Sequence, residues 1–214
     1  MVDLDALWAE QPDAAAVADH IGTIKATGVR VAASVSPKRA EALAGPAIDA
    51  EVDVLAILGG VVSAEHVSST PHVLNLMSFI RHLDIPVIVG GCASEGAALH
   101  LMRTGAAGVV VGIDRPELGV AVPLGTALAD ARSARVRHLD ETGVYCHLIA
   151  RGPITTGADV AKAVACGADA VLVDAAVVLG DPPHGDAAEG LRRAMALCGY
   201  TDVKDFQKAE VVVR

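Results

Sequence analysis

Three sites in this 214-residue chain have side chains that could take part in a reaction or bind a ligand. Cys92 follows the apolar segment IPVIVGG and is a candidate nucleophile if its thiol ionises. Glu65 and His66 are adjacent in a polar loop and could act as an acid and a base. Arg151 ends the segment VYCHLIAR, and its guanidinium could bind an anion. The first hypothesis is therefore an active or binding site at the ends of apolar segments.

These side chains also have structural explanations, which stay open at this point. Cys92 is also interpreted as a small buried residue. Ser63 or Ser68, in the same loop as Glu65, could cap a helix. His147 lies inside an apolar segment and is interpreted as a core histidine with satisfied hydrogen bonds rather than as a base.

Arg151 is the most suggestive single charge. It could bind an anion, or it could neutralise Asp174 or Asp114 across the mouth of a site. The alternative is a salt bridge with a purely structural role.

The elements that must position these residues form a repeating pattern of apolar strand and Ala-rich helix. The nearly continuous, β-branched segments are typical of strands covered on both faces. The predicted strands are 29–36, 52–60, 85–91, 108–113, 144–152 and 170–180. The predicted helices are 38–49, 75–83, 95–104, 121–138, 157–166 and 186–198. This alternation predicts a parallel sheet with right-handed crossovers, in one domain.

Two details support this prediction. Thr156 and Asp159 form a capping box at the start of one helix, and Gly167 and Gly105 are left-handed helix stops. The segments 103–112 and 165–174 share one pattern, which favours a barrel over a doubly wound sheet. Six strands are fewer than the eight of a closed (β/α)8 barrel, so the chain is predicted to be an incomplete barrel.

Active sites of such barrels lie at the carboxyl ends of the strands. Gly90 and Gly91 lack a Cβ and could let a ligand approach closely, although a tight turn after the strand is the alternative. The residues at the predicted strand ends are Ser34, Ser36, Gly59, Gly60, Gly90, Gly91, Cys92, Asp114, Arg115, Arg151, Gly152 and Asp174.

Composition and charge exclude several classes of function. Only 2% of the residues are aromatic and the formal net charge is −9, so nucleic acid is an unsuitable partner. No apolar run is long enough for a membrane span, and the acidic start MVDLDALWAEQPD lacks the pattern of a signal peptide. The four cysteines form no CxxC pair and the histidines form no HxxxH motif, which argues against a metal site. We expect a cytoplasmic protein with reduced thiols.

Long segments of the chain resemble the IMP dehydrogenase/GMP reductase family, in particular its IMP dehydrogenase-related branch. They include GVRVAASVSPKRAE, LNLMSFIRHLDIPVIVGGCAS, ITTGADVAKAVACGADAV and LRRAMALCGYTDVKDFQKAEVVV. The resemblance implies a (β/α)8 barrel without CBS domains, a purine nucleotide as ligand, NAD(P) as cofactor and self-association, commonly as tetramers. It also implies that the first two strands of the family's barrel are missing here.

The chain departs from the family pattern where the chemistry is expected. In the family, a cysteine loop follows the strand that matches GVVVGI, and its thiolate attacks the purine ring before hydride passes to NAD. Here the shortened connection 114–131 contains no cysteine. An Asp-Gly-Gly-Ile motif has become Arg151-Gly152-Pro153-Ile154, Asp174 stands where the family binds phosphate, and the flap is reduced to 180–190.

Two functions follow from this comparison. The first is a family member that has lost the cysteine-dependent oxidation of IMP and serves as a binding or regulatory partner, as a homo-oligomer or with a full-length relative. The alternative is an oxidoreductase that acts on a purine nucleotide with NAD(P) through a rearranged site.

Overall fold

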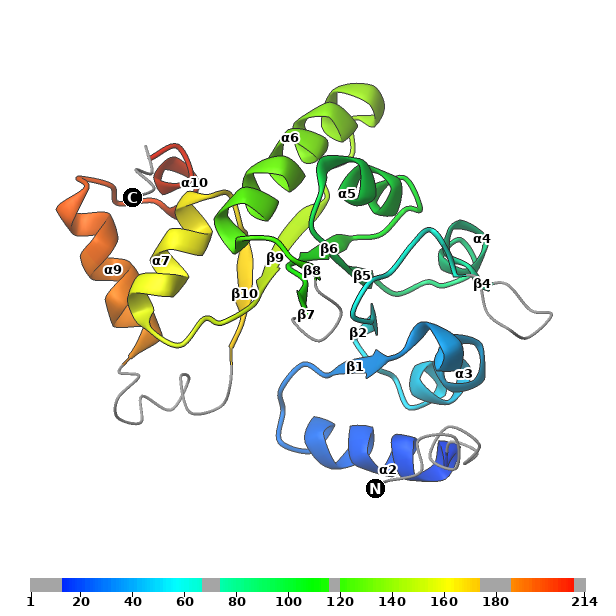
Figure 1. Cartoon of the computed structure of the whole chain (residues 1–214). Coiled ribbons are helices and arrows are strands. Elements are labelled where there is room, and N and C mark those ends of the chain that lie inside the picture. Colours follow the sequence, from blue (N-terminus) through cyan, green and yellow to red (C-terminus); the bar gives the residue numbers. More distant parts are fainter. Residues whose placement is uncertain (1–12, 67–73, 116–119, 174–185, 210–214) are drawn as a thin grey trace, which may run out of the picture.

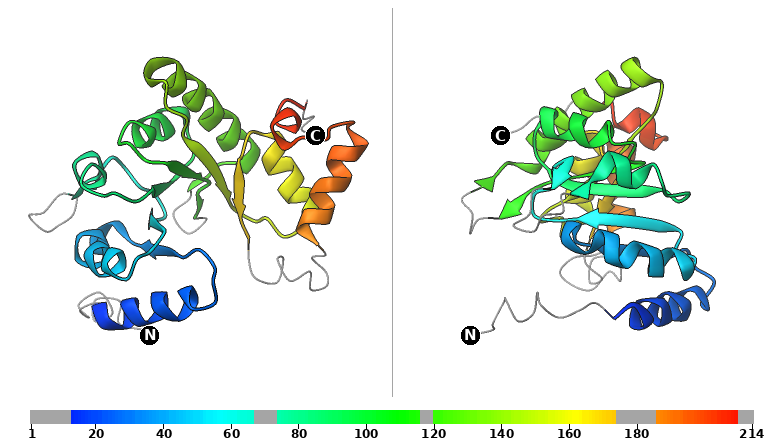
Figure 2. Two further views of the ribbon diagram at one scale, coloured as in Figure 1. Left: turned by 180° about the vertical axis from the view of Figure 1, so that it is seen from behind. Right: turned by 90° about the vertical axis from the view of Figure 1, so that its right-hand side faces the viewer.

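Six parallel strands form the central sheet. The computed structural model describes residues 13–66, 74–115, 120–173 and 186–209. The strands are β1 (Ala32–Val35), β2 (Val54–Leu58), β5 (Val87–Cys92), β6 (Gly108–Val111), β9 (His147–Arg151) and β10 (Ala170–Leu172). They pair in the order β1-β2-β5-β6-β9-β10, and the sheet curls into an open part of a barrel (Figures 1 and 2). The predicted incomplete barrel is confirmed.

Helices cover the outer, convex side of the curled sheet (Figures 1 and 2). They are α2 (Ala14–Lys25), α3 (Ala40–Asp49), α4 (Leu76–Ile80), α5 (Glu95–Met102), α6 (Leu124–Thr142), α7 (Gly157–Ala165), α9 (Ala187–Leu197) and α10 (Val203–Phe206), with a short 3₁₀ turn at Pro37–Arg39. No helix in the described part of the chain combines the length and apolarity needed to cross a membrane.

The structure adds elements that the sequence did not predict. Helix α2 was not predicted, and neither were two antiparallel hairpins, β3 (Glu65–His66) with β4 (Leu74–Asn75) and β7 (Asp114–Arg115) with β8 (Val120–Ala121). Helix α6 was predicted to end at residue 138 but continues to Thr142, where Gly143 turns the chain with φ of +71°. The predicted capping box of Thr156 and Asp159 is present.

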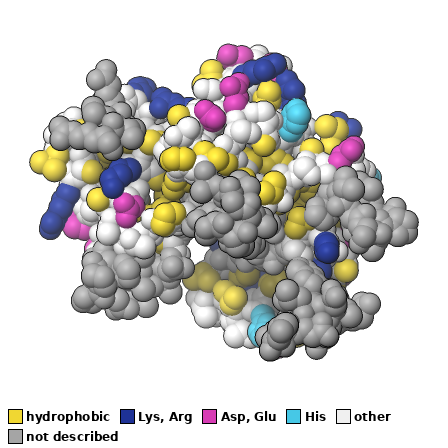
Figure 3. Space-filling view, in the orientation of Figure 1, with side chains coloured by type: hydrophobic (Ala, Val, Ile, Leu, Met, Phe, Trp, Pro, Cys, Tyr) yellow, Lys and Arg dark blue, Asp and Glu magenta, His cyan; other side chains and the backbone are white. Residues whose placement is uncertain are grey.

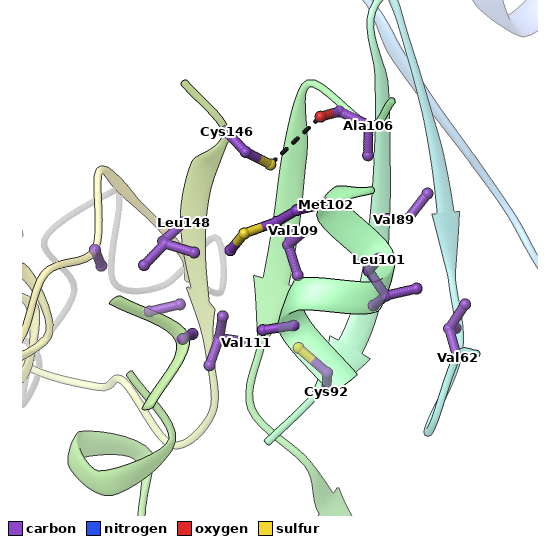
Figure 4. Close-up of a cluster of buried hydrophobic side chains, with 14 of the residues drawn as sticks. Val62, Val89, Cys92, Leu101, Met102, Ala106, Val109, Val111, Cys146 and Leu148 are labelled. Carbon is purple, nitrogen blue, oxygen red and sulfur yellow. Dashed lines mark hydrogen bonds between the residues drawn. The ribbon is translucent and has the colours of Figure 1, made fainter. Parts of the chain in front are cut away.

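The main hydrophobic core lies between the sheet and the helices. Alternate residues of each strand point toward the helices, and Val109, Val111 and Leu148 pack there with Leu101 and Met102 of α5 (Figure 4). The intervening residues face the concave side of the sheet. In edge strand β10 this face is open, because Leu172 is 42% exposed.

A network around Asp169 joins the C-terminal segment to the amino ends of the strands. One carboxylate oxygen accepts hydrogen bonds from Arg135 Nη1 at 2.8 Å and the backbone N–H of Leu148 at 2.9 Å. The other accepts from Lys204 Nζ at 2.6 Å, Tyr145 Oη at 2.8 Å and a third donor, the side-chain amide of Gln207, at 3.2 Å. Helices α6 and α10 and strand β9 are therefore held by one partly buried carboxylate.

The ionisation of Asp169 makes stability depend on pH. Burial by itself raises the pKa of this carboxyl, but the hydrogen bonds from Lys204, Leu148, Tyr145 and Gln207 outweigh burial and lower the pKa to about 2. Because the folded pKa lies below the unfolded value of about 3.9, the stabilisation is present above that pH and is lost as the pH falls through about 2.

We predict that Asp169→Asn lowers the free energy of unfolding by about 3 kcal/mol at neutral pH, since it leaves the buried guanidinium of Arg135 without its counter-charge. Urea unfolding of both proteins over a pH series measures the effect, and the difference should shrink toward acid pH. The matched control is Asp205→Asn, which removes one exposed ion pair with Lys208 and should cost less than about 1 kcal/mol. Equal losses for the two variants would contradict the assigned role of Asp169.

Candidate functional site at the carboxyl ends of the strands

Glycines allow the carboxyl ends of four neighbouring strands to lie close together. A Cβ on Gly90 would lie 2.4 Å from the carbonyl oxygen of Val110 in the adjacent strand, and the φ of Gly90 is +150°. A Cβ on Gly91 would lie 2.9 Å from the carbonyl oxygen of Gly112 and 3.2 Å from that of Gly60. The close contact between strands therefore requires glycine at residues 90 and 91. The sequence had suggested two other reasons, the close approach of a ligand and a tight turn after the strand.

Gly112 sets the position of the next strand. Its φ is +127°, and a Cβ there would lie 1.8 Å from the carbonyl oxygen of Arg151. Glycine is therefore needed at this position both for its conformation and for its lack of a side chain. The close approach of β6 and β9 places Arg151 at the mouth of the open barrel.

Arg151 reaches across the concave side of the sheet. Its Nη1 donates a hydrogen bond to the carbonyl oxygen of Gly59, at the end of β2, over 3.3 Å. Strands β5 and β6 lie between the two partners in the sheet. No ion pair of Arg151 is present among the described residues, and Asp174 and the side chain of Asp114 lie outside them. The predicted neutralisation of Arg151 by either carboxylate therefore remains a prediction.

A pocket of about 300 Å³ opens beside this arginine. Its walls come from the ends of β6 and β9 and from the start of α6, and they are mostly apolar. They consist of Gly112, Ile113, Val122, Pro123, Leu124, Arg151, Gly152 and Pro153. Gly152 lets a wall residue pack closely, because a Cβ there would lie 3.3 Å from Leu124 Cδ2. The apolar wall could not be predicted from the sequence, because its side chains have no reactive or charged group that would mark them as site residues.

The thiol of Cys92 points away from this mouth. Cys92 is 1% exposed, belongs to the core between sheet and helices, and lies near Val111 (Figure 4). Its Sγ is 3.7 Å from the carbonyl oxygen of Val110. Burial, with a smaller contribution from Cys146, raises the pKa of Cys92 to about 12. A buried neutral thiol cannot serve as the nucleophile at neutral pH.

None of the other three cysteines lies at the mouth of the open barrel. Cys146 is buried against the carbonyl oxygen of Ala106 (Figure 4), and burial raises its pKa to about 12. Cys166 is half-buried at the end of α7, and burial raises its pKa as well. Cys198 is exposed at the end of α9. The described residues include all four cysteines of the chain, so none of them supplies an ionised thiol at the mouth.

Among the remaining predicted residues, those whose side chains the structure describes do not line the pocket. Ser34 is exposed in edge strand β1, and the buried Ser36 Oγ has no hydrogen-bond partner among the described residues. Asn75 donates a hydrogen bond to the side chain of Glu65 over 3.3 Å. The side chain of His66 lies outside the described residues, so the acid–base pair of Glu65 and His66 is untested. No cluster of three or more His, Cys, Asp or Glu in the described part of the chain could hold a metal ion.

The structure contradicts two structural explanations drawn from the sequence, the first of them in part. Ser63 caps no helix, because it precedes β3 and its hydroxyl donates to the carbonyl oxygen of Glu65. Ser68, the other predicted cap, lies outside the described residues. The side chain of His147 is 60% exposed rather than part of the core. It begins β9 on the same side as Arg151, which is the open concave face of the sheet, and its Nδ1 lies 3.8 Å from Asp169.

Comparison with known proteins gives one consistent result. A family model described as the IMP dehydrogenase / GMP reductase domain matches residues 17–179. An inosine-5′-monophosphate dehydrogenase of Methanocaldococcus jannaschii is 35% identical over 153 residues, which cover 67% of this chain and 28% of that protein. The crystal structure of an IMP dehydrogenase/GMP reductase-like protein from Corynebacterium glutamicum matches with a TM-score of 0.86 and 36% identity, over 96% of this chain and 67% of that one.

One longer relative has residues that are absent here. An uncharacterised oxidoreductase of Mycolicibacterium smegmatis is 40% identical over 247 residues, which cover 90% of this chain and 66% of the relative. This chain therefore spans less than two thirds of the relative's length. The match extends over more residues than this chain possesses, so the relative carries additional segments inside the matched region.

We predict that Cys92 resists alkylation in the folded protein. Its thiol is buried and protonated, whereas the exposed Cys198 should react readily. Treatment with iodoacetamide at mildly alkaline pH, followed by peptide mass spectrometry, measures each site separately. Unfolded protein, in which all four cysteines should react, is the control. Modification of native Cys92 as fast as that of Cys198 would contradict its assignment as a core residue.

We predict that Gly112→Ala destabilises the fold by about 3 kcal/mol or more, because the new methyl group meets the backbone of Arg151 and φ is positive. Gly22→Ala is the matched control, since Gly22 lies within α2 and has open space at its Cβ position. The control should leave stability unchanged or raise it by about 0.5–1 kcal/mol. Urea unfolding compares the two, and similar effects would refute the tight contact of β6 with β9.

Proposed function

Since this chain belongs to the IMP dehydrogenase/GMP reductase family, we propose that it binds a purine nucleotide at the open mouth of its barrel without cysteine-dependent oxidation of IMP. The observation that carries this proposal is the placement of the four cysteines, none of which presents an ionised thiol to the mouth. A covalent thiol intermediate requires such a group. The chain is then a binding or regulatory member of an oxidoreductase family.

The pocket beside Arg151 supports binding of a ring with an anionic group. Its mostly apolar wall suits a flat heterocycle, and its volume of about 300 Å³ is at the lower end for small-ligand sites. Arg151 is the one cation of the wall, and its single described hydrogen bond goes to a backbone carbonyl. The remaining N–H donors of the guanidinium can bind phosphate oxygens. A nucleoside monophosphate has both the ring and the anion.

The alternative function is a purine-nucleotide oxidoreductase with NAD(P) and a rearranged site. Family membership favours this cofactor, which would accept hydride from the substrate. The described residues do not fit the thiol-dependent route to that hydride, because Cys92 faces the core. No step through NAD(P) is therefore assigned to them.

Two measurements separate these functions. Thermal unfolding in the presence of IMP, GMP, XMP or NAD(P) detects binding, since a ligand at 100 times its Kd stabilises the fold by about 2.7 kcal/mol. Absorbance of NADH or NADPH detects turnover. We expect stabilisation by a nucleoside monophosphate without formation of reduced cofactor. The absence of any nucleotide effect would refute the binding proposal, and turnover with IMP would support the alternative.

We predict that Arg151→Met weakens binding of IMP about tenfold or more, because it removes charge-assisted hydrogen bonds to phosphate but keeps the apolar stem. Binding of inosine, which lacks the phosphate, should change less than about twofold. Calorimetry on both ligands measures the difference. Arg193→Met, which alters an exposed arginine on α9, is the control and should change neither. Equal weakening of IMP and inosine would contradict a phosphate contact at Arg151.

A further inference from the structure

A second hollow lies at the amino ends of β5 and β6, at the end of the sheet opposite the mouth of the open barrel. It opens between the end of α4 and the turn that follows α5, two helices that are neighbours on the convex side (Figures 1 and 2). Its volume is about 320 Å³, and it shares no lining residue with the pocket of the proposed binding function. We call it the α4–α5 hollow, and its wall includes Ile80, Arg81, Ile85, Pro86, Arg103 and Gly105.

Backbone that is already fixed by hydrogen bonds forms one side of this hollow. The N–H of Ala107 donates to the carbonyl oxygen of Val87 over 2.9 Å, and the N–H of Gly105 donates to that of Met102 over 3.1 Å. The φ of Gly105 is +90°, and a Cβ there would lie 3.8 Å from Ile80 Cγ2, so the turn packs against the end of α4. A ligand therefore enters a hollow whose walls are in place, which lowers the entropic cost of binding.

Apolar side chains form much of the remaining wall. Ile80 is 8% exposed, Ile85 is partly buried, and Met77 is 39% exposed. Leu83 and Pro86 line the hollow beside them. These side chains can remove one ring or one short branched chain from water, since the volume is at the lower end for small-ligand sites.

Two guanidinium groups belong to the residues that line the same hollow. Arg81 is the residue at the end of α4, and Arg103 is the residue at the end of α5. Arg81 is exposed and has no ion pair among the described residues. The side chain of Arg103 is 41% exposed, and its Nη2 donates to Glu141 Oε2 over 2.7 Å. The other N–H donors of Arg103 are left available.

Arginines outnumber carboxylates around this hollow. Glu141 also accepts a hydrogen bond from Arg137 Nε over 2.9 Å, so one carboxylate is shared by two guanidiniums. Figure 3 shows acidic and basic side chains mixed at the top of the view, where α6 lies. None of the described residues in the wall is acidic, and Asp84 is not among them. In a chain with a formal net charge of −9, such a local excess of positive charge favours an anionic ligand.

The helix dipole explains only part of this arrangement. A cation at the carboxyl end of a helix interacts favourably with the dipole, and this applies to each of the two arginines separately. It does not explain why both helices bring their terminal arginines to one apolar hollow.

We infer that the α4–α5 hollow binds a small organic anion with an apolar body, at a site separate from the proposed nucleotide pocket. The anionic group lies between Arg81 and Arg103, since a guanidinium can donate two parallel hydrogen bonds to a carboxylate or a phosphate. The apolar body lies against Ile80, Ile85 and Pro86. Both parts are needed, because an ion pair that is open to water contributes little by itself.

Titration of the isotope-labelled full chain with phenyl phosphate and with benzoate, followed by NMR, tests this site. Each probe joins one ring to one anionic group. The backbone amide signals of Gly105 and Ala107 should shift and saturate with a Kd of about 1 mM or below. Inorganic phosphate and phenol each represent half of a probe and should bind about tenfold or more weakly. The tighter of the two ring probes identifies the preferred anion as phosphate or carboxylate.

Arg81→Met removes the charge, keeps an apolar stem and should weaken binding of the preferred probe about tenfold. Arg81 is exposed and has no described ion pair, so the variant should stay folded, and unchanged amide signals elsewhere in the spectrum verify this. Arg193→Met on α9 is the matched control and should bind like the wild type. Arg151→Met separates the two sites, because it should leave the shifts of Gly105 and Ala107 unchanged.

Three results would overturn the inference. The first is the absence of shifts at Gly105 and Ala107 with either ring probe up to about 10 mM. The second is equal affinity for inorganic phosphate and phenyl phosphate, or an Arg81→Met protein that binds like the wild type. The third is loss of these shifts in Arg151→Met, which would assign them to the mouth of the barrel. A nucleotide that fails to stabilise the fold bears on the proposed function alone.

Discussion

The carboxyl ends of β5, β6 and β9 can meet only because three backbone positions have no side chain. Gly90 and Gly91 allow β5 to approach the ends of β6 and β2, and Gly112 allows β6 to approach the backbone of Arg151. This close packing brings the carboxyl ends of the strands together and gives Arg151 its position. The pocket, its single cation and its apolar wall all depend on that contact between strands.

Asp169 has the corresponding role at the opposite end of the strands. It gathers donors from α6, β9, α10 and the residue that follows α10, and it stays ionised because these donors outweigh the effect of its burial. The C-terminal segment is thereby attached to the sheet by charge in addition to the apolar packing of Phe206 in the main core. One end of the sheet thus depends on glycines and the other on a partly buried carboxylate. The main core lies between the sheet and the helices on its convex side.

The same arrangement shows how a chain can belong to this family and still lack a thiolate at the mouth of its barrel. The scaffold of the IMP dehydrogenase/GMP reductase family depends on the core between sheet and helices, and that core is present. The family's oxidation chemistry depends on loops at the mouth, and changes in such loops leave the core intact. A chain can therefore keep the fold, and with it an apolar pocket and a cation, without presenting a thiolate.

The sequence by itself determined the alternation of strand and helix, the capping box at Thr156 and the absence of a cysteine from the connection 114–131 that follows β6, because each depends on residue types a few positions apart. Tertiary structure decided the exposure of His147, the burial of Cys92 and the hydrogen bond from Arg151 to Gly59. These features depend on which face of a strand a residue occupies and on partners as many as 92 positions away. Only the folded sheet determines such neighbours, so local pattern could name the candidate residues but could not bring them together.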